Sequence, residues 1–185
     1  MKIVLDPGHG GRDPGAVDGI DLAEGDNIHT READLALILA ILLRPLLGSN
    51  RVILTREADV TLPLANRVAL ANQEQADLFV SLHFNAAKNT AARGIETLYH
   101  TSGKRLAELI QAQLVKELGG VDRGVKRRTD LYVLKHTNCP AVLVELGFLT
   151  NPESEVKLNS VSYLTMAARA IAQAVNLYAK ERGED

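Results

Sequence analysis

The chain has 185 residues, of which 46% are hydrophobic and 24% are charged, so one globular domain with a substantial core is expected. The formal net charge of −2 argues against nucleic acid as a partner, because contacts to phosphates require a strongly basic surface. The single cysteine, Cys139, excludes an internal disulfide and a cysteine-based zinc site, and we interpret it as a small buried side chain.

The first part of the chain predicts a strand, a long loop and a helix. Lys2–Asp6 is a short apolar run that ends in a turn, and a loop rich in Gly and Asp follows to about Thr30. Apolar side chains at helical spacing predict a helix that begins near Glu32. This helix should end before Pro45, because proline lacks the backbone N–H that a helix interior requires.

Strands and helices continue to alternate along the rest of the chain. Short apolar runs predict strands, and apolar side chains three or four residues apart predict helices. The expected elements are a strand at Arg51–Thr55, a helix at Thr61–Gln75, strands at Asp77–Leu82 and Gly94–Tyr99, a helix at Leu106–Leu118, strands at Leu131–Leu134 and Ala141–Glu145, and a helix at Val161–Tyr178.

Strands that are apolar on both faces and separated by helices are typical of an α/β fold. We expect a single domain over residues 1–185, with a mostly parallel, twisted sheet of about six strands and helices on both faces. The longest apolar stretch, Leu35–Leu43, is too short to cross a bilayer, so no membrane insertion is expected.

Three side chains with catalytic potential follow the ends of predicted strands. His9 comes just after the first strand, His83 ends the third, and Glu145 ends the last. In open α/β sheets, ligand sites gather outside the carboxyl ends of the strands. We therefore expect these three residues to lie along one edge of the sheet.

Two imidazoles and a carboxylate bind Zn²⁺ well, and three protein ligands with a position open to water are typical of a catalytic zinc. His9 and His83 would supply the imidazoles. Glu32 and Glu24 are both candidates for the carboxylate. Glu32 is preferred because a helix start is a rigid platform, although acidic residues also favour the first helical turn for electrostatic reasons alone.

Glu145 interrupts an apolar run, Ala141–Phe148, that would otherwise be buried. A carboxylate there costs several kcal/mol unless it is paired or placed in a cleft. Burial should also raise its pKa, which suits a residue that takes and then returns a proton. Asn85, after the second histidine, could bind substrate or simply form a turn.

Five segments of the chain closely resemble the zinc-dependent N-acetylmuramoyl-L-alanine amidases of the "amidase 3" type. They occur in the order typical of that family, and the resemblance runs from Lys2 to about Tyr178. The segments are Val4–Gly11, Leu54–Arg56, Arg67–Asn72, Ala76–Ala86 and Pro140–Asn151.

This resemblance implies hydrolysis of the amide bond between N-acetylmuramic acid and the first L-alanine of the peptidoglycan stem peptide. Matched motif by motif, one Zn²⁺ would be bound by His9, Glu32 and His83, with Glu145 as the catalytic carboxylate. The loop from Asp18 to Thr30 departs from the family pattern by being longer and more acidic, which leaves Glu24 in contention as the third ligand.

Two other functions are weighed against this one. A non-catalytic module that binds muropeptides is disfavoured, because all four residues of the implied site are intact. A zinc peptidase that cuts within the stem peptide is disfavoured, because no His-Glu-x-x-His helix occurs in the chain.

A basic segment, Arg123–Arg128, is a candidate site for the acidic stem peptide. Its cations Lys126, Arg127 and Arg128 could equally form a solvated loop. Arg56 and Arg67, which lie in two of the family-like segments, are further candidates for substrate binding together with Asn85.

Peptidoglycan is the expected partner, so the protein should act at the cell wall, outside the cell or in the periplasm. The chain opens without a signal peptide, which leaves export by other means, a phage origin or a place within a longer protein. We expect a monomer that needs no activator, because the segment Asn85–Arg93 is too short and too polar to form a helix that plugs the site.

Overall fold

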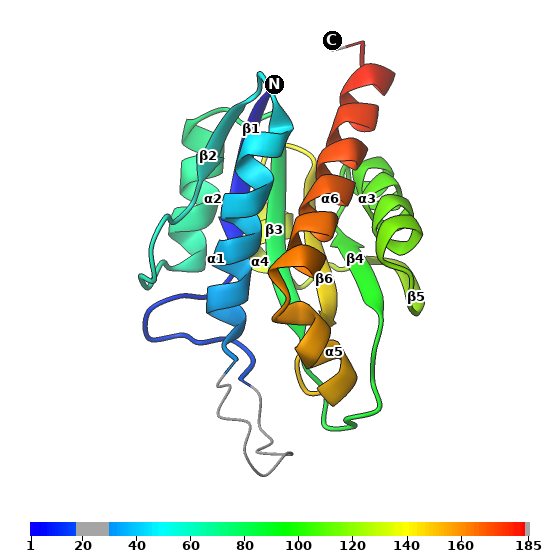
Figure 1. The fold of residues 1–185 in the computed structure, drawn as a ribbon. Coiled ribbons are helices and arrows are strands. Elements are labelled where there is room, and N and C mark those ends of the chain that lie inside the picture. Colours follow the sequence, from blue (N-terminus) through cyan, green and yellow to red (C-terminus); the bar gives the residue numbers. More distant parts are fainter. Residues whose placement is uncertain (18–29, 184–185) are drawn as a thin grey trace.

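The computed structural model describes residues 1–17 and 30–183. Its core is one six-stranded sheet with the strand order β2-β1-β3-β6-β4-β5 (Figure 1). The elements are β1 (Lys2–Pro7), α1 (Glu32–Leu43), the 3-10 helix η1 (Arg44–Leu47), β2 (Arg51–Leu54), α2 (Leu64–Gln73), β3 (Leu78–Asn85), β4 (Ile95–Tyr99), α3 (Lys104–Leu118), β5 (Asp122–Arg127), α4 (Tyr132–His136), β6 (Ala141–Phe148), α5 (Pro152–Leu158) and α6 (Val161–Glu181).

Helices cover both faces of the sheet. On one face α1, α3 and α6 enclose the larger apolar cluster, which takes Ile3 and Leu5 from β1. On the other face α2 and α4 enclose a smaller cluster, which takes Val4 from β1 and Phe79 from β3. This alternation follows from the pleat of a strand, which points successive side chains to opposite faces. The α/β fold with a mostly parallel sheet of six strands is confirmed.

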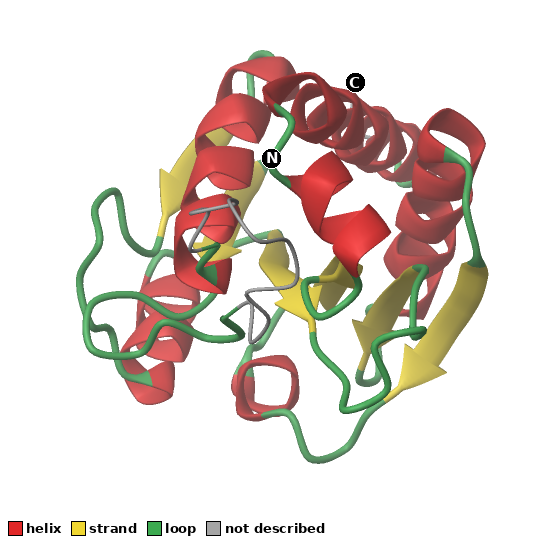
Figure 2. Cartoon of the chain, turned by 60° about the horizontal axis from the view of Figure 1, so that its bottom comes forward, coloured by secondary structure: helices red, strands yellow, loops and turns green. Residues whose placement is uncertain are grey.

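One strand pair is antiparallel. The pairs β1·β2, β1·β3, β3·β6 and β4·β5 are parallel, whereas β4 runs antiparallel to β6. Consequently the carboxyl ends of β1, β3 and β6 meet at one edge of the sheet, and β4 begins at that edge. Figure 2 looks toward this edge.

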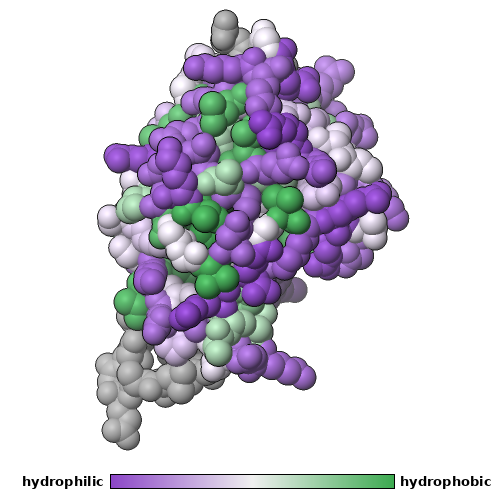
Figure 3. All heavy atoms as spheres, turned by 90° about the vertical axis from the view of Figure 1, so that its right-hand side faces the viewer, coloured by the Kyte–Doolittle hydropathy of each residue, from purple (hydrophilic) through white to green (hydrophobic). Residues whose placement is uncertain are grey.

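In the C-terminal half one predicted strand was wrong, and one segment has a structure that the sequence did not predict. The expected strand at Leu131–Leu134 is instead the start of α4, whose Val133 and Leu134 are buried in the smaller apolar cluster. Four apolar residues do not distinguish a strand from one helical turn. The charged segment around Arg123 is not a loop but the edge strand β5. Charges are common on edge strands because they discourage pairing with another chain. The side of the molecule that lies on the right in Figure 1 is largely hydrophilic (Figure 3).

Two further features complete the fold. Helix α5, which the periodicity did not predict, begins at Pro152, and the Asn151 side chain caps it by accepting a hydrogen bond of 2.9 Å from the Ser154 N–H. Helix α1 ends at Leu43, as predicted from Pro45. Within the described residues, no helix is both long and apolar enough to cross a membrane.

Candidate metal centre and active site

Three potential metal ligands converge at the carboxyl edge of the sheet. His9 follows β1, His83 lies near the end of β3, and Glu32 begins α1. One ligand atom from each residue lies within 4.8 Å of the others. The structure therefore brings together the set of residues that the sequence predicted as ligands.

The spacing of these atoms suits a small tetrahedral ion. Glu32 Oε1 lies 2.8 Å from His83 Nδ1 and 3.2 Å from His9 Nε2, and the two rings are nearly perpendicular at 79°. Ligand atoms at typical Zn–N and Zn–O distances in a tetrahedral site lie about 3.3 Å apart. The donor set and its spacing fit Zn²⁺ without a large rearrangement.

An additional carboxylate, Asp13, orients the first imidazole. His9 Nδ1 lies 2.8 Å from Asp13 Oδ2, and Asp13 Oδ1 accepts the N–H of Gly15 at 3.1 Å. Nδ1–H can therefore donate to Asp13 and leave Nε2 for a metal, which is the usual arrangement around metal-bound histidine. Sequence analysis missed Asp13. Its only signal was an acid four residues after the histidine in a glycine-rich loop.

Glu32 is held by the backbone as well as by the imidazoles. Its Oε2 accepts the N–H of Ala16 at 2.7 Å, and its Oε1 accepts the N–H of Phe84 at 3.0 Å. Glu32 is only 4% exposed, and its carboxylate is oriented by the loop that contains Ala16, by strand β3 and by its own position at the start of α1. Glu24 lies outside the described residues, and the choice of Glu32 over Glu24 remains a prediction.

The electrostatics of the cluster favour a cation. Burial would lower the pKa of His9, but hydrogen bonds and charge from Glu32 and Asp13 raise it to about 9. Burial would raise the pKa of Glu32, but the hydrogen bonds from His83 and His9 hold it well below its usual range. Two carboxylates facing one imidazole thus create a negative local potential.

Glycine at position 8 leaves the space that the second imidazole fills. A Cβ on Gly8 would lie 2.3 Å from His83 Cε1 and 2.5 Å from His83 Nε2. His9 itself has a positive φ of 58°, a conformation that costs a non-glycine residue free energy and recurs at functional sites. The turn after β1 is therefore shaped around the two histidines.

This crowding makes Gly8→Ala a sharp test of the centre. The methyl group should push the His83 ring away from Glu32 and weaken zinc binding by about 10- to 100-fold, comparable to losing a supporting contact around a metal ligand. Zinc affinity measured by competition with a chromophoric chelator would show the loss. Gly48→Ala is a control for backbone strain without crowding: Gly48 has a φ of 62°, so alanine there costs stability, but no atom other than its chain neighbours lies within 4 Å of the added Cβ, and zinc affinity should not change. Unchanged affinity in Gly8→Ala would contradict the geometry.

Arg56 and Arg67 have a structural role in the turn after β1, and their contact with substrate stays a prediction. Both side chains are 3% exposed. Arg56 donates to the carbonyls of Pro7, Gly8 and Ala33, and Arg67 donates to the carbonyls of Pro7 and His9 and to Asp6 Oδ1 at 2.8 Å. Their guanidinium groups fasten the loop that carries His9, which explains why they occur in these segments.

Glu145 lies beside the three potential ligands, on β6. It is the register partner of His83 on β3 and of Glu96 on β4. Its Oε2 is buried and has no hydrogen-bond partner within the described residues. Burial raises the pKa of this carboxyl to about 7. An uncompensated buried carboxylate costs stability, and such groups are frequent at catalytic sites.

The basic segment places its cations on different faces of β5. Lys126 pairs with Leu98, which packs on the α2 and α4 face, whereas Arg127 pairs with Tyr99, which packs on the α3 and α6 face. Arg127 therefore points away from the site, contrary to the grouping that the sequence suggested. Arg128 is paired with Asp130 at 2.6 Å in an exposed ion pair.

Asn85 contacts the acidic residue of β4 rather than the ligand cluster. Its Nδ2 lies 3.3 Å from Glu96 Oε1, and its own Oδ1 accepts the N–H of Ala86 at 2.8 Å. Both interpretations of Asn85, as a substrate contact and as a turn residue, are compatible with this position.

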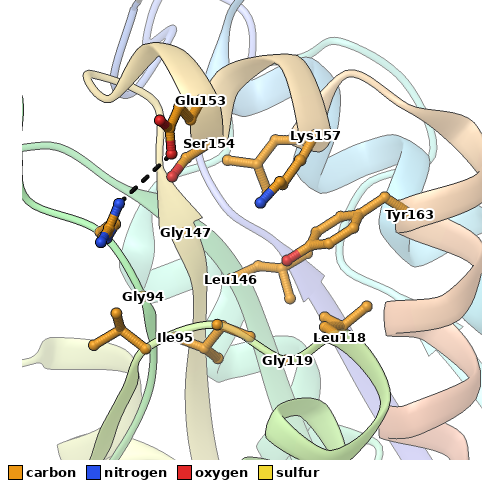
Figure 4. A pocket seen from close by; sticks show the side chains of 14 residues that line it. Gly94, Ile95, Leu118, Gly119, Leu146, Gly147, Glu153, Ser154, Lys157 and Tyr163 are labelled. Carbon is orange, nitrogen blue, oxygen red and sulfur yellow. Dashed lines mark ion pairs between the residues drawn. The ribbon is translucent and has the colours of Figure 1, made fainter.

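Two cavities flank β6. One of about 390 Å³ adjoins His9 and His83 and is walled by apolar side chains of the α2 and α4 segments, among them Leu62, Leu64 and Val133. The other, of about 210 Å³, lies beside α5, where Lys157 and Tyr163 point into it and an Arg93–Glu153 ion pair stands at its rim (Figure 4). Neither the potential ligands nor Glu145 line this second cavity, whereas His9 and His83 line the first. The first cavity is therefore the one that adjoins the candidate site.

Comparison with known proteins places these features in one family. The model of the family described as N-acetylmuramoyl-L-alanine amidase matches residues 3–177. N-acetylmuramoyl-L-alanine amidase LytC of Bacillus subtilis is 38% identical over 174 residues, which is 91% of this chain and 34% of LytC. The chain thus spans about a third of that relative.

Solved structures agree over the whole fold. The crystal structure of N-acetylmuramoyl-L-alanine amidase from Clostridium difficile 630 is 36% identical with a TM-score of 0.90, covering 98% of each chain. The CwlD amidase from Clostridioides difficile, solved in complex with the GerS lipoprotein, is 33% identical with a TM-score of 0.90, covering 97% of this chain and 98% of its own.

Proposed function

Because the chain belongs to the N-acetylmuramoyl-L-alanine amidase family, we propose that it hydrolyses the amide bond between N-acetylmuramic acid and L-alanine in peptidoglycan. His9, Glu32 and His83 would hold one Zn²⁺, and Glu145 would be the catalytic acid and base. Residues 1–185 would form one amidase domain that acts on the cell wall, outside the cell or in the periplasm.

The donor chemistry supports zinc over a purely acid–base mechanism. Two imidazoles and one carboxylate at the carboxyl edge of the sheet match catalytic zinc sites with three protein ligands. The contact between Asp13 and Nδ1 of His9 orients one of these imidazoles. Zinc at such a site supplies a Lewis acid that lowers the pKa of water and polarises a carbonyl oxygen. The protein must then supply a group that moves protons.

Glu145 is suited to carry protons between water and the leaving group. Its carboxyl has a pKa near 7 because of burial, so it can take a proton from the attacking water and later return it to the departing alanine nitrogen. Without that returned proton the amine is a poor leaving group. The observation that carries the proposal is the buried Oε2 of Glu145, which lacks a protein partner within the described residues and lies beside the potential ligands.

The products of peptidoglycan digestion test this function directly. The purified, zinc-loaded protein alone should release stem peptides with a free L-alanine amino terminus, detected by mass spectrometry. Intact walls after digestion would indicate a binding module, and internally cut peptides would indicate a peptidase. Either result would contradict the proposal.

No activator should be needed for this release. The described residues between β3 and β4 form turns and no helix, so this segment offers nothing to cover the ligand cluster. Addition of a partner lipoprotein, of the kind seen with CwlD, should leave the rate unchanged. A monomer in solution, measured by light scattering during the same assay, is the expected active form.

A further inference from the structure

A cationic pair lies on the opposite side of Glu145 from the ligand cluster. The strand order places β1 and β3 with the two histidines first, then β6 with Glu145, then β4 with Glu96, and finally β5. Arg123 and Lys126, the cationic pair, project from β5 onto the same face as Glu96. The centre is thus flanked by the apolar cavity on one side and by positive charge on the other.

A bulge in β5 brings the two cations together. Arg123 and Lys126 are three residues apart, and in a regular strand they would point to opposite faces. The register between β4 and β5 shifts after Ile95, opposite Gly124, which has a φ of 75°. The extra residue returns Lys126 to the face of Arg123, as β-bulges do when they redirect side chains next to active sites.

Glu96 holds the pair in place. Its Oε2 accepts Arg123 Nε–H at 2.7 Å and Lys126 Nζ–H at 2.5 Å, and its side chain is only 9% exposed. The Arg123 guanidinium also lies over the Phe148 ring, 4.9 Å from its centroid. One carboxylate opposes two cations, so the cluster keeps a net positive charge. The cations retain exposed surface, 34% for Arg123 and 43% for Lys126.

We propose that Arg123 and Lys126 bind a carboxylate of the stem peptide, on the leaving-group side of the scissile amide, with Glu96 as the residue that positions them. This inference rests on the proposed function. The peptide carries the carboxylates of the substrate, whereas the lactyl carboxyl of the sugar is consumed in the amide. The glycan would then lie toward α2 and α4, and the peptide toward β5.

The strand spacing limits which carboxylate is bound. Two strand spacings, from β6 through β4 to β5, amount to about 10 Å, and an extended peptide advances about 3.3 Å per residue. The bound carboxylate therefore lies within about three residues of the scissile bond. A site at this distance distinguishes free from amidated carboxylates near the start of the peptide.

Kinetics with two muramoyl-peptides test the assignment. One substrate carries a free carboxylate at the second peptide residue, and the other carries the amide at that position. Lys126→Met, which keeps the aliphatic stem, and Arg123→Gln should each raise KM about tenfold for the acidic substrate with kcat nearly unchanged. Neither variant should alter KM for the amidated substrate.

Arg127→Met is the matched control. It removes the same charge from the adjacent residue, but from the opposite face of β5. We expect no change in KM for either substrate. An equal effect of Arg127→Met would indicate a general field of positive charge, and an unchanged KM in Lys126→Met and Arg123→Gln would rule out contact with the peptide. Either outcome overturns the inference.

Binding of the product peptide separates this inference from the proposed function. Titration calorimetry with a free L-alanyl peptide, acidic or amidated, needs no turnover. Preferential binding of the acidic form that depends on Lys126 would support the inference even if no bond were cut, in which case the proposed function alone fails. Turnover with no preference for the acidic peptide would refute the inference alone.

Discussion

Replacing Glu145 with glutamine is expected to lower kcat by roughly 10²- to 10⁴-fold, the usual contribution of general acid–base catalysis. Glutamine has nearly the same shape, but its amide cannot take a proton from water or return one to the alanine nitrogen. The measurement is release of L-alanyl peptides from a defined muropeptide by the zinc-loaded variant. Glu153→Gln on the exposed start of α5 is the matched control and should be fully active.

Stability distinguishes a catalytic Glu145 from a structural one. The pKa of its carboxyl is raised to about 7 in the folded protein, from 4.5. The unfolded chain therefore loses this proton first, and above pH 7 the folded state bears a buried negative charge, so this group lowers stability as pH rises from about 4.5 to 7. Glu145→Gln should unfold at the same or a higher temperature at pH 8. A lower unfolding temperature together with normal turnover would show that Glu145 serves only the fold.

Patterns that depend on period and burial were predictable from the sequence. The strands β1, β3 and β6 each begin with an apolar run, and the helices α3 and α6 have apolar side chains at helical spacing. These strands and helices could therefore be assigned without coordinates. The edge on which His9, His83 and Glu145 meet followed from topology, because carboxyl ends of parallel strands share an edge.

Features that depend on tertiary context were not predictable. The edge strand β5 has few apolar side chains, since only Val125 packs against the core, and its pairing comes from the backbone of β4. The charges of Arg56 and Arg67 suggested contacts with substrate, but the sequence did not reveal that their N–H groups donate to the carbonyls of Gly8 and His9 in the turn after β1. A sequence alone does not reveal which cationic side chains are buried and donate hydrogen bonds to backbone carbonyls. Likewise Asp13 becomes meaningful only when its distance to His9 is known.

Removal of the metal should abolish hydrolysis, and the ligand variants should identify what holds it. Treatment with a chelator followed by gel filtration should leave an inactive, folded protein, and added Zn²⁺ should restore activity. Full activity in a verified metal-free sample would refute the zinc mechanism. The affinity should also fall on acidification below about pH 9, because the pKa of His9 is raised to about 9 by Glu32 and Asp13, and a bound metal must displace that proton.

Zinc content of purified variants decides between Glu32 and Glu24. Glu32→Ala should lose stoichiometric zinc, because its Oε1 lies within 3.2 Å of both imidazoles, whereas Glu24→Ala should keep it. Asp13→Asn should bind zinc about 10- to 100-fold more weakly, as expected for a residue that orients a ligand from behind. His100→Ala, remote from the cluster, is the control for loss of a histidine. If Glu32→Ala retained zinc and Glu24→Ala lost it, the third ligand would be Glu24. That result would refute the assignment of Glu32, which was made because it begins a helix.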